Sequence, residues 1–298
     1  MCGIVGYTGN KPAQEIVIES LKKLEYRGYD SSGIALHEGE IVFSKKEGPI
    51  ANLESVLGSS NSKMAIAHTR WATHGVPSDV NSHPHLSNDG KIAVVHNGTI
   101  DNYLDIKSSL ENEGFNFLSE SDTEVIPNLL SKYYEGDLVK AVSKILDEIE
   151  GIYTIAAIHV DNPEQIVSVR NETPLVIGLG NEENYVASDI YAILKYTQQI
   201  IYPEDHQIVS VSPRGAKVLD QNLNEVKFEV ETVEKYTEVA EKGGFEHFML
   251  KEIFEQPKAL QDSQTELFVN SPLDHLDLNW KIGSISVVAC GTSYHAGL

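Results

Sequence analysis

Short stretches of β-forming residues, separated by polar turns, limit the folds that are open to this chain. Five of them follow one another between Tyr153 and about Leu219: YTIAAIHV, QIVSVR, PLVIGLG, YVAS and QIVSVS. Most of the connections between them are too short for the crossover helix that a parallel strand pair needs. We therefore predict largely antiparallel sheets, with the few helices layered outside them.

The residues before Tyr153 fit the same α and β pattern. GIALHEGEIVFSKKEG predicts a hairpin that turns at Glu38-Gly39, and KMAIAHTRW and KIAVVHNGT predict further strands that end in polar corners. Helices are predicted in three places: residues 11–26 with Pro12 at the start, residues 101–113, and from Ser121 or Asp122 to near Gly136.

Composition excludes several classes of protein. The net charge of −21 argues against a nucleic-acid partner, because phosphate backbones are held by clustered cations. No stretch approaches the roughly 18 to 20 apolar residues of a membrane helix, and the N-terminus lacks the plan of a secretory signal. The only two cysteines, Cys2 and Cys290, lie at opposite ends of the chain, so neither a disulfide framework nor a paired-cysteine metal site is indicated. We expect a cytoplasmic protein without a membrane partner.

The composition changes after about residue 236. A Gly-Gly break and a helical run interrupted at Pro257 predict a linker. The chain then reads SISVVACGTSYHAGL, a strand followed by a Gly-Thr-Ser turn of the kind that offers N–H groups and hydroxyls to a phosphate. A plain strand-to-helix turn is the alternative. Because one strand and half a helix cannot build a domain, we expect the front part of a longer protein.

Cys2 is the candidate nucleophile. If Met1 is removed, Cys2 carries a thiol and a free α-amine, and such an amine has a pKa of about 7.7 to 8.0, which suits a base. An N-terminal residue of this kind supplies nucleophile and base together. It still needs donors for the oxyanion of a tetrahedral intermediate and a clamp for the substrate.

The polar corners supply candidates for both tasks. The amide of Asn97 and the N–H of Gly98, in HNG, can face an oxyanion. Arg70 can hold a carboxylate through two hydrogen bonds, with Thr73 and His74 beside it, and Asp122 can pair with an ammonium group.

Each candidate also has a purely structural interpretation. Cys2 can be accidental, Asn97-Gly98 can be a turn, and Asp122 can cap the helix that follows it. Several nearby histidines suggest a metal, but their spacing matches no metal-binding motif. On a strand-like segment, His83 and His85 would also point to opposite faces. The histidines are His68, His74, His83, His85 and His96.

Taken together, the motifs resemble a known family. MCGIVGY, LEYRGYDSSGIA, IAHTRWATHGVPSDVNSHPH, VVHNGTIDNY and SESDTEV are similar, in order and spacing, to the glutamine amidotransferase domain of the N-terminal-nucleophile hydrolase class. Within that class the resemblance is to the glutamine–fructose-6-phosphate aminotransferase family, and TPLVIGLG, ASDIYAIL, KEIFEQP and CGTSYHAG extend it along the whole chain. It implies an α+β fold, a four-layer αββα sandwich of mainly antiparallel sheets.

The resemblance also assigns roles, residue by residue. Cys2 matches the nucleophile, and Asn97 and Gly98 match the oxyanion hole. The glutamine-binding positions are Arg70, Thr73, His74 and Asp122, and Trp71 matches a gate residue within RWATHGVPS, a loop that closes over glutamine. Arg27 matches a residue over the nucleophile, although a salt bridge that holds its turn is the alternative. Thr292 and Ser293 match part of a sugar-phosphate cradle.

The resemblance further implies a division of the chain and a set of partners. Residues 2–236 would be the glutaminase domain, residues 237–283 a linker with a helical lead-in, and residues 284–298 the start of a truncated sugar isomerase domain. L-Glutamine is the implied substrate, fructose 6-phosphate would bind the rest of the isomerase domain, and the complete protein would be a homodimer. No cofactor and no metal are implied. The alternatives are another amidotransferase of this class, of the amidophosphoribosyltransferase or asparagine synthetase type, and a non-catalytic glutamine-sensing fragment.

Overall fold

The computed structural model describes residues 2–233, 245, 248–265, 286, 288 and 291–298. The chain divides into two compact units, Met1–Ala240 and Glu241–Leu298, and each is described by itself.

An eight-stranded antiparallel sheet forms one half of the first unit. Its strand order is β14-β11-β9-β10-β1-β4-β2-β3, so the strand next to the N-terminus, β1, lies in the interior of the sheet between β10 and β4. The hairpin predicted around Glu38-Gly39 is β2 and β3, and Gly39 takes the positive φ of +83° that its turn needs. The strands are β1 Gly3–Thr8, β2 Ser31–His37, β3 Ile41–Glu47, β4 Met64–Arg70, β9 Val176–Leu179, β10 Asn184–Ala187, β11 Gln199–Ile201 and β14 Glu231–Thr232.

A six-stranded antiparallel sheet forms the other half. Its order is β13-β12-β8-β7-β6-β5, and β6 and β7 pair along nine residues from Ile92↔His159 to Ile100↔Gly151. The strands are β5 His85–Leu86, β6 Ile92–Ile100, β7 Gly151–His159, β8 Ile166–Asn171, β12 Ile208–Ser212 and β13 Gly215–Leu219.

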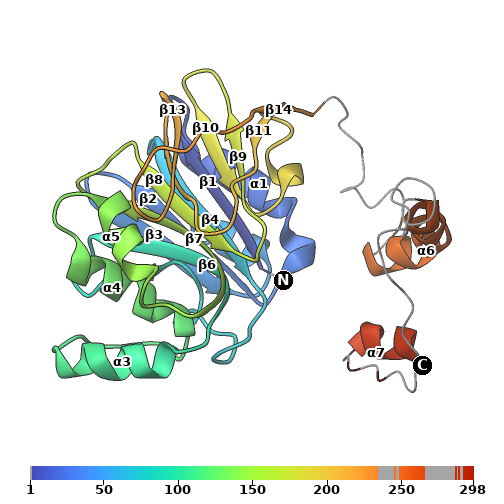
Figure 1. Cartoon of the computed structure of the whole chain (residues 1–298), viewed down its shortest axis with the longest axis horizontal. Helices are drawn as coiled ribbons and strands as arrows, with labels where there is room; N and C mark the ends of the chain where they lie inside the picture. Colours follow the sequence, from blue (N-terminus) through green and yellow to red (C-terminus); the bar gives the residue numbers. More distant parts are fainter. Residues whose placement is uncertain (1, 234–244, 246–247, 266–285, 287, 289–290) are drawn as a thin grey trace, which may run out of the picture. The chain divides into compact units, whose positions relative to one another are not determined.

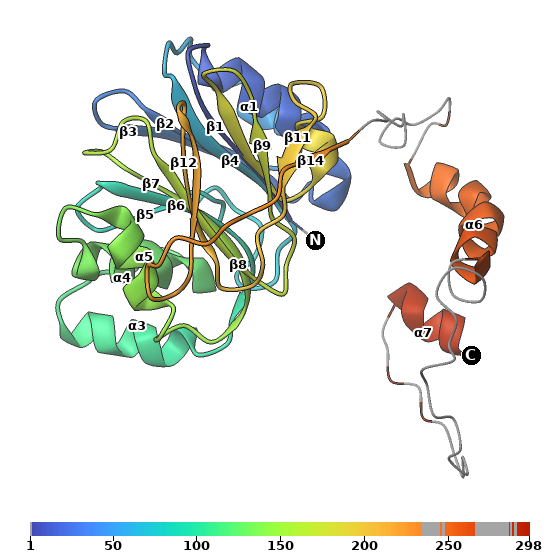
Figure 2. The ribbon, with the colours of Figure 1, turned by 45° about the horizontal axis from the view of Figure 1, so that its top comes forward.

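Helices cover the outer face of each sheet. Figures 1 and 2 show α1 on one side of the unit and α3, α4 and α5 together on the other. Apolar residues of α1 and α2 form one buried cluster with the eight-stranded sheet, and those of α3 to α5 form another with the six-stranded sheet. The helices are α1 Ala13–Lys22, α2 Ile50–Glu54, α3 Tyr103–Asn112, α4 Val125–Tyr133 and α5 Leu138–Ile145, with 3-10 turns η1 Glu25–Arg27, η2 Asp122–Glu124 and η3 Ile190–Ala192.

A third apolar cluster lies between the sheets. It joins Ile4 and Ile66 of the eight-stranded sheet to Val95 and Ile158 of the six-stranded one, all of them fully buried. Each such side chain contributes about 1.5–3 kcal/mol when it leaves water. The predicted four-layer αββα sandwich of mainly antiparallel sheets is therefore confirmed.

The structure differs from the sequence predictions in its helices. The first helix, predicted over 11–26, ends at Lys22, and the separate turn η1 follows it. The helices α2 and α5 were not predicted at all. Asp137 caps α5 by accepting from the N–H groups of Val139 and Lys140, at 3.0 and 3.4 Å.

The second unit contains α6 Phe248–Thr265 and α7 Gly291–Gly297. An interruption was predicted at Pro257, but α6 continues through it, because a proline inside a helix costs one backbone hydrogen bond without always ending the helix. The predicted linker lies largely outside the described residues, as does the strand before Cys290, so the predicted domain boundaries stay predictions.

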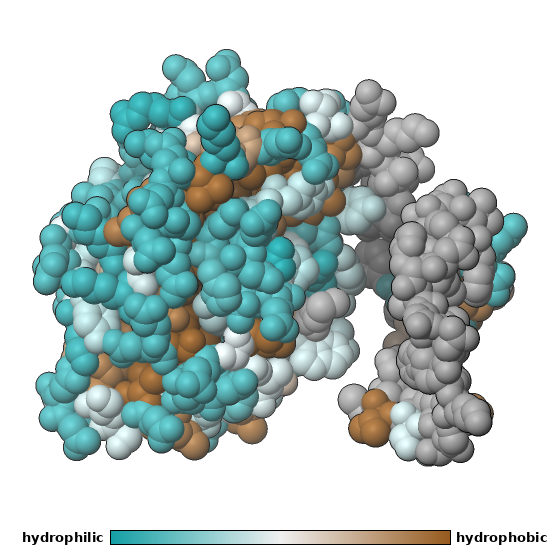
Figure 3. All heavy atoms as spheres, in the orientation of Figure 1, coloured by the Kyte–Doolittle hydropathy of each residue, from teal (hydrophilic) through white to brown (hydrophobic). Residues whose placement is uncertain are grey.

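Hydrophilic side chains cover most of the face of the first unit seen in Figure 3, with hydrophobic ones visible between them. Among the helices that the structure describes, none is both long and apolar enough to cross a membrane.

Candidate active site

Cys2 lies directly before β1, at a point where the two sheets meet. The register Gly3↔Thr69 between β1 and β4 brings Cys2 beside the end of β4, and the Trp71 N–H donates to Cys2 Sγ at 3.2 Å. From the other sheet, Asn97 Nδ2 donates to the Cys2 carbonyl oxygen at 3.1 Å. The antiparallel strands thus bring residues that are 95 positions apart in sequence into one corner.

The surroundings of the thiol act on its pKa in opposing directions. Burial raises the pKa of Cys2, while the hydrogen bond from Trp71 and the charge of Arg70 lower it and the charge of Asp122 raises it again. The net direction is upward, so the thiol needs a base before it can attack a carbonyl.

Asn97 and Gly98 lie near the end of β6. Asn97 is buried, with 6% of its surface exposed. Gly98 has a φ of +118°, and a Cβ there would lie 1.9 Å from the carbonyl oxygen of Ile152 on the neighbouring strand. Glycine is therefore the only residue that fits position 98 without moving β7.

Arg70 ends β4 with a buried guanidinium group. Its Nη2 donates to the carbonyl oxygens of His74 and Gly75, the latter at 3.3 Å. Its Nη1 is buried and has no hydrogen-bond partner among the described residues. Arg70 thus holds the segment that follows β4 and keeps one nitrogen available for an acceptor.

Asp122 faces the same corner from η2. Its Oδ2 accepts from the Ile100 N–H at 2.9 Å, and its Oδ1 lies 3.9 Å from His74 Nδ1. The cap of η2 is Ser121, whose hydroxyl accepts from the Thr123 N–H. Asp122 therefore does not serve as that cap, which was the structural alternative for it.

Trp71 and Thr73, the other two predicted residues of this segment, have exposed side chains. The Trp71 indole meets the ring of Tyr29 edge to face, with the centroids 5.6 Å apart. The structure thus brings together seven of the predicted residues: Cys2, Arg70, Trp71, His74, Asn97, Gly98 and Asp122.

Arg27 has the contacts that its structural alternative predicts. Its Nη2 pairs with Asp189 Oδ2, Nη1 donates to the Ser188 carbonyl oxygen at 3.4 Å, and Nε donates to the Tyr26 hydroxyl at 3.3 Å. The Ser188 hydroxyl accepts from the Ile4 N–H of β1 at 2.9 Å. Arg27 is thereby tied to β1, the strand that directly follows Cys2, and a direct role over the nucleophile stays a prediction.

Four buried histidines pack behind the corner. The rings of His83 and His85 lie 5.0 Å apart, edge to face, so the expectation that they point to opposite faces was wrong. Residues two positions apart on a strand point to the same face, so a strand-like segment places these two rings together rather than apart. Burial lowers the pKa of each of the four imidazoles: His68, His83, His85 and His96. In the part of the chain that the structure describes, no three histidine, cysteine or acidic residues are grouped to hold a metal ion.

Sequence reasoning missed the contacts of these histidines with the site. His68 Nε2 lies 3.0 Å from Asn97 Oδ1, and Thr123 Oγ1 lies 2.8 Å from His96 Nδ1. His68 and Asn97 belong to different sheets, so no spacing in the sequence relates them.

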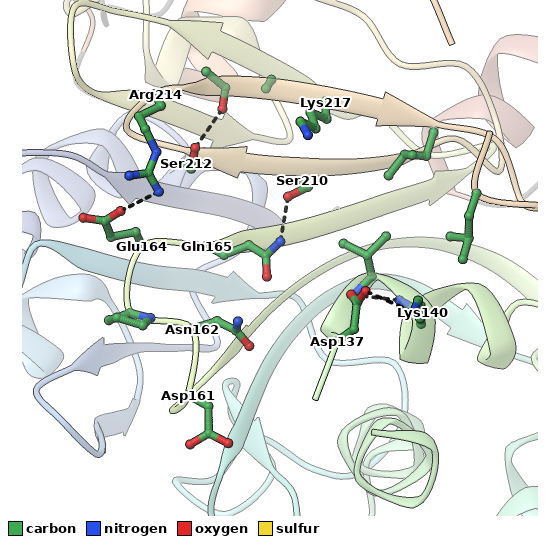
Figure 4. A pocket seen from close by; sticks show the side chains of 16 residues that line it. Asp137, Lys140, Asp161, Asn162, Glu164, Gln165, Ser210, Ser212, Arg214 and Lys217 are labelled. Carbon is green, nitrogen blue, oxygen red and sulfur yellow. Dashed lines mark hydrogen bonds and ion pairs between the residues drawn. The ribbon is translucent and has the colours of Figure 1, made fainter. Parts of the chain in front are cut away.

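Two features lie outside this corner. Thr292 and Ser293 are in α7 of the second unit, and their predicted sugar-phosphate role stays a prediction. A groove of about 800 Å³ lies along α5 and the β8–β12–β13 edge, lined by Asp137, Glu164, Gln165 and Arg214 among others (Figure 4). None of the predicted site residues lines it.

Comparison with known proteins points to the same family that the sequence motifs resemble. Residues 68–195 match the family model described as "Glutamine amidotransferase domain". Over its full length the chain is 50% identical to the glutamine–fructose-6-phosphate aminotransferase [isomerizing] of Caldanaerobacter subterraneus subsp. tengcongensis and 46% identical to that of Aquifex aeolicus. It covers 51% and 50% of those two proteins, so the chain spans about half the length of the curated relatives it matches.

Solved structures agree on the fold. Glutamine phosphoribosylpyrophosphate amidotransferase from B. subtilis, complexed with ADP and GMP, matches with a TM-score of 0.65 and 27% identity over 75% of this chain and 50% of that one. The chain therefore carries a glutamine amidotransferase domain, and over its full length it is homologous to about half of a glutamine–fructose-6-phosphate aminotransferase.

Proposed function

We propose that this chain hydrolyses L-glutamine to glutamate and ammonia, with Cys2 as the nucleophile. The observation that carries the proposal is the meeting of Cys2 and the Asn97 amide across the two sheets, in the fold of an amidotransferase. Arg70 Nη1 and Asp122, at the same corner, suit the α-carboxylate and α-ammonium groups of an amino acid.

The reaction follows from these positions. With Met1 removed, the Cys2 amine takes the thiol proton, and the sulfur attacks the side-chain amide carbon of glutamine. Asn97 Nδ2 and the Gly98 N–H donate to the oxyanion. The C–N bond breaks, ammonia leaves with the proton from the amine, and a γ-glutamyl thioester remains. Water, deprotonated by the same amine, attacks the thioester, and glutamate and the free thiol are released.

The wider role is that of one half of a larger enzyme. We propose that the ammonia serves to convert fructose 6-phosphate into glucosamine 6-phosphate, in a homodimeric cytoplasmic protein whose sugar isomerase domain begins near residue 284. Full-length relatives at 41–50% identity support this role over the amidophosphoribosyltransferase type, for which the identity is 27%. The meeting of Cys2, Asn97, Arg70 and Asp122 in one corner favours catalysis over a fragment that only senses glutamine.

A glutaminase assay tests the proposal. Glutamate release from glutamine is measured for the chain after intact-mass analysis has shown that Met1 is absent. Cys2→Ala abolishes turnover, whereas Cys290→Ala, which alters the only other cysteine, leaves it unchanged. Turnover that survives in Cys2→Ala would refute the nucleophile assignment. Added fructose 6-phosphate yields no amino sugar with this chain alone.

A further inference from the structure

The contacts of the Asn97 amide fix which of its two ends faces Cys2. The atom 3.1 Å from the Cys2 carbonyl oxygen must be the nitrogen, because that oxygen only accepts hydrogen bonds. Oδ1 of the same amide therefore faces His68 Nε2 at 3.0 Å. Since Oδ1 is also only an acceptor, His68 Nε2 must carry the hydrogen.

The environment of His68 fits a neutral imidazole with this single tautomer. The side chain is fully buried, and burial lowers its pKa to about 3. Its Nδ1 has no hydrogen-bond partner among the described residues, which fits a ring nitrogen that carries no hydrogen.

Neighbouring side chains hold the ring in place. His68 stacks on His83 with centroids 4.1 Å apart and planes 15° from parallel. His83 Nδ1 accepts from the His96 N–H at 3.2 Å, so a neutral His83 carries its hydrogen on Nε2 and donates to Thr123 Oγ1, also at 3.2 Å. The Thr123 hydroxyl is then free to donate to His96 Nδ1 at 2.8 Å. The backbone N–H of His96 thus determines the direction of every hydrogen bond in this chain.

We infer that His68 is a positioning residue for the oxyanion donor: its Nε2–H holds Asn97 so that one N–H of Nδ2 binds the Cys2 carbonyl and the second faces the oxyanion. This inference rests on the proposed glutaminase function. His68 itself touches neither glutamine nor the reacting atoms. Without it, the Asn97 amide loses the acceptor contact that distinguishes its two ends and can rotate its oxygen toward the oxyanion.

Two substitutions separate this role from simple packing. Gln carries its amide nitrogen the same number of bonds from Cβ as the His Nε2, so His68→Gln retains a donor for Asn97 Oδ1. His68→Leu fills the site without a donor. Loss of an oxyanion donor costs about a hundred- to a thousandfold in rate, so we expect His68→Leu to lower kcat by about 10- to 100-fold. KM for glutamine stays within about twofold, and His68→Gln restores most of kcat.

His159 provides the matched control. It is as deeply buried as His68 and lies on β7, but it stacks on Tyr134 and its register partner is Ile92 at the far end of β6 from Asn97. His159→Leu removes an equally buried imidazole and leaves kcat unchanged. A His68→Leu enzyme with wild-type kcat, or one in which only KM rises, would overturn the inference.

A measurement that does not depend on activity tests the tautomer of His68 directly, even if a chain is inactive. Long-range ¹H–¹⁵N spectra of histidine-labelled protein report which ring nitrogen of His68 carries the hydrogen. The inference requires Nε2–H, unchanged between pH 8 and pH 5, and is overturned by Nδ1–H or by a charged ring. If the wild-type chain proves inactive after removal of Met1, the glutaminase proposal fails, while the tautomer still decides whether His68 orients Asn97.

Discussion

At the scale of single residues, Gly98 is the position where backbone geometry and the proposed chemistry depend most directly on each other. Gly98→Ala would place a Cβ against the Ile152 carbonyl at a φ of +118°, so β6 and β7 must separate just where Asn97 is held. We expect a loss of more than about 2 kcal/mol in the free energy of unfolding and a fall of at least about a hundredfold in glutaminase kcat. Urea denaturation and the assay measure the two effects.

Gly90 is the control for Gly98. It also has a positive φ, +70°, but a Cβ there meets no atom within 4 Å. Gly90→Ala should cost only the backbone term of about 1–2 kcal/mol and leave kcat intact. Equal effects of the two substitutions would show that the contact with Ile152 is unimportant.

Arg70 carries the second prediction at this scale. Its Nη2 is used by the His74 and Gly75 carbonyls, which leaves Nη1 for a carboxylate. The single ammonium of a lysine cannot serve both sets of acceptors in the same geometry. Arg70→Lys should therefore raise KM for glutamine by about tenfold, or 1.4 kcal/mol, with a smaller change in kcat. Arg214→Lys, on the exposed ion pair with Glu164, is the control and leaves KM unchanged. If KM for glutamine stays at the wild-type value in Arg70→Lys, the carboxylate is held by another residue.

At the scale of elements, the buried histidines between β4, β5 and β6 make stability depend on pH. They are held neutral in the folded chain, and the pKa of His68 is lowered to about 3, whereas an unfolded histidine has a pKa of about 6.5. Below pH 6.5 the unfolded chain therefore binds protons that the folded chain does not. The free energy of unfolding therefore falls as pH drops below 6.5, by up to about 1.4 kcal/mol per pH unit for each histidine that stays neutral in the folded chain, and for His68 this continues toward pH 3.

Urea denaturation at pH 7, 6 and 5 measures this slope. His68→Gln removes one such group and should reduce the slope by about one proton. His295, which is exposed in α7, is the matched control, and His295→Gln leaves the slope as it is. A slope that His68→Gln does not change would mean that His68 is already charged in the folded protein.

The elements also show how far the sequence predicts this fold. The strands and the β2–β3 hairpin could be predicted because alternating apolar residues and a Glu-Gly turn are local signals. For α5 the sequence does contain a local signal, because Asp137 precedes apolar residues at helical spacing: Leu138, Ala141, Val142 and Ile145. The contact between His68 and Asn97 had no such signal, because it depends on two sheets packing face to face.

At the scale of the whole molecule, all three buried apolar clusters of the described residues belong to the first unit. The core residues that they contain run from Ile4 in β1 to Val218 in β13, and Val233 packs against their edge. The seven residues of the candidate site corner lie in the same unit. The first unit thus holds both a complete set of core layers and the corner at which glutamine is proposed to react.

A chain cut after residue 236, the predicted end of the glutaminase domain, tests whether the first unit folds and hydrolyses glutamine without the second unit. It keeps the three clusters, so we expect a cooperative unfolding transition with a midpoint within about 4 °C of the longer chain, a change equivalent to about 1–2 kcal/mol or less. The glutaminase kcat should also be retained. Calorimetry and the assay on both chains measure these quantities, and a point variant of the second unit, Phe254→Ser on the exposed surface of α6, should leave both unchanged. A shortened chain that unfolds without cooperativity would show that residues after 236 contribute to the core, and a folded but inactive one would show that they are needed to organise the corner around Cys2.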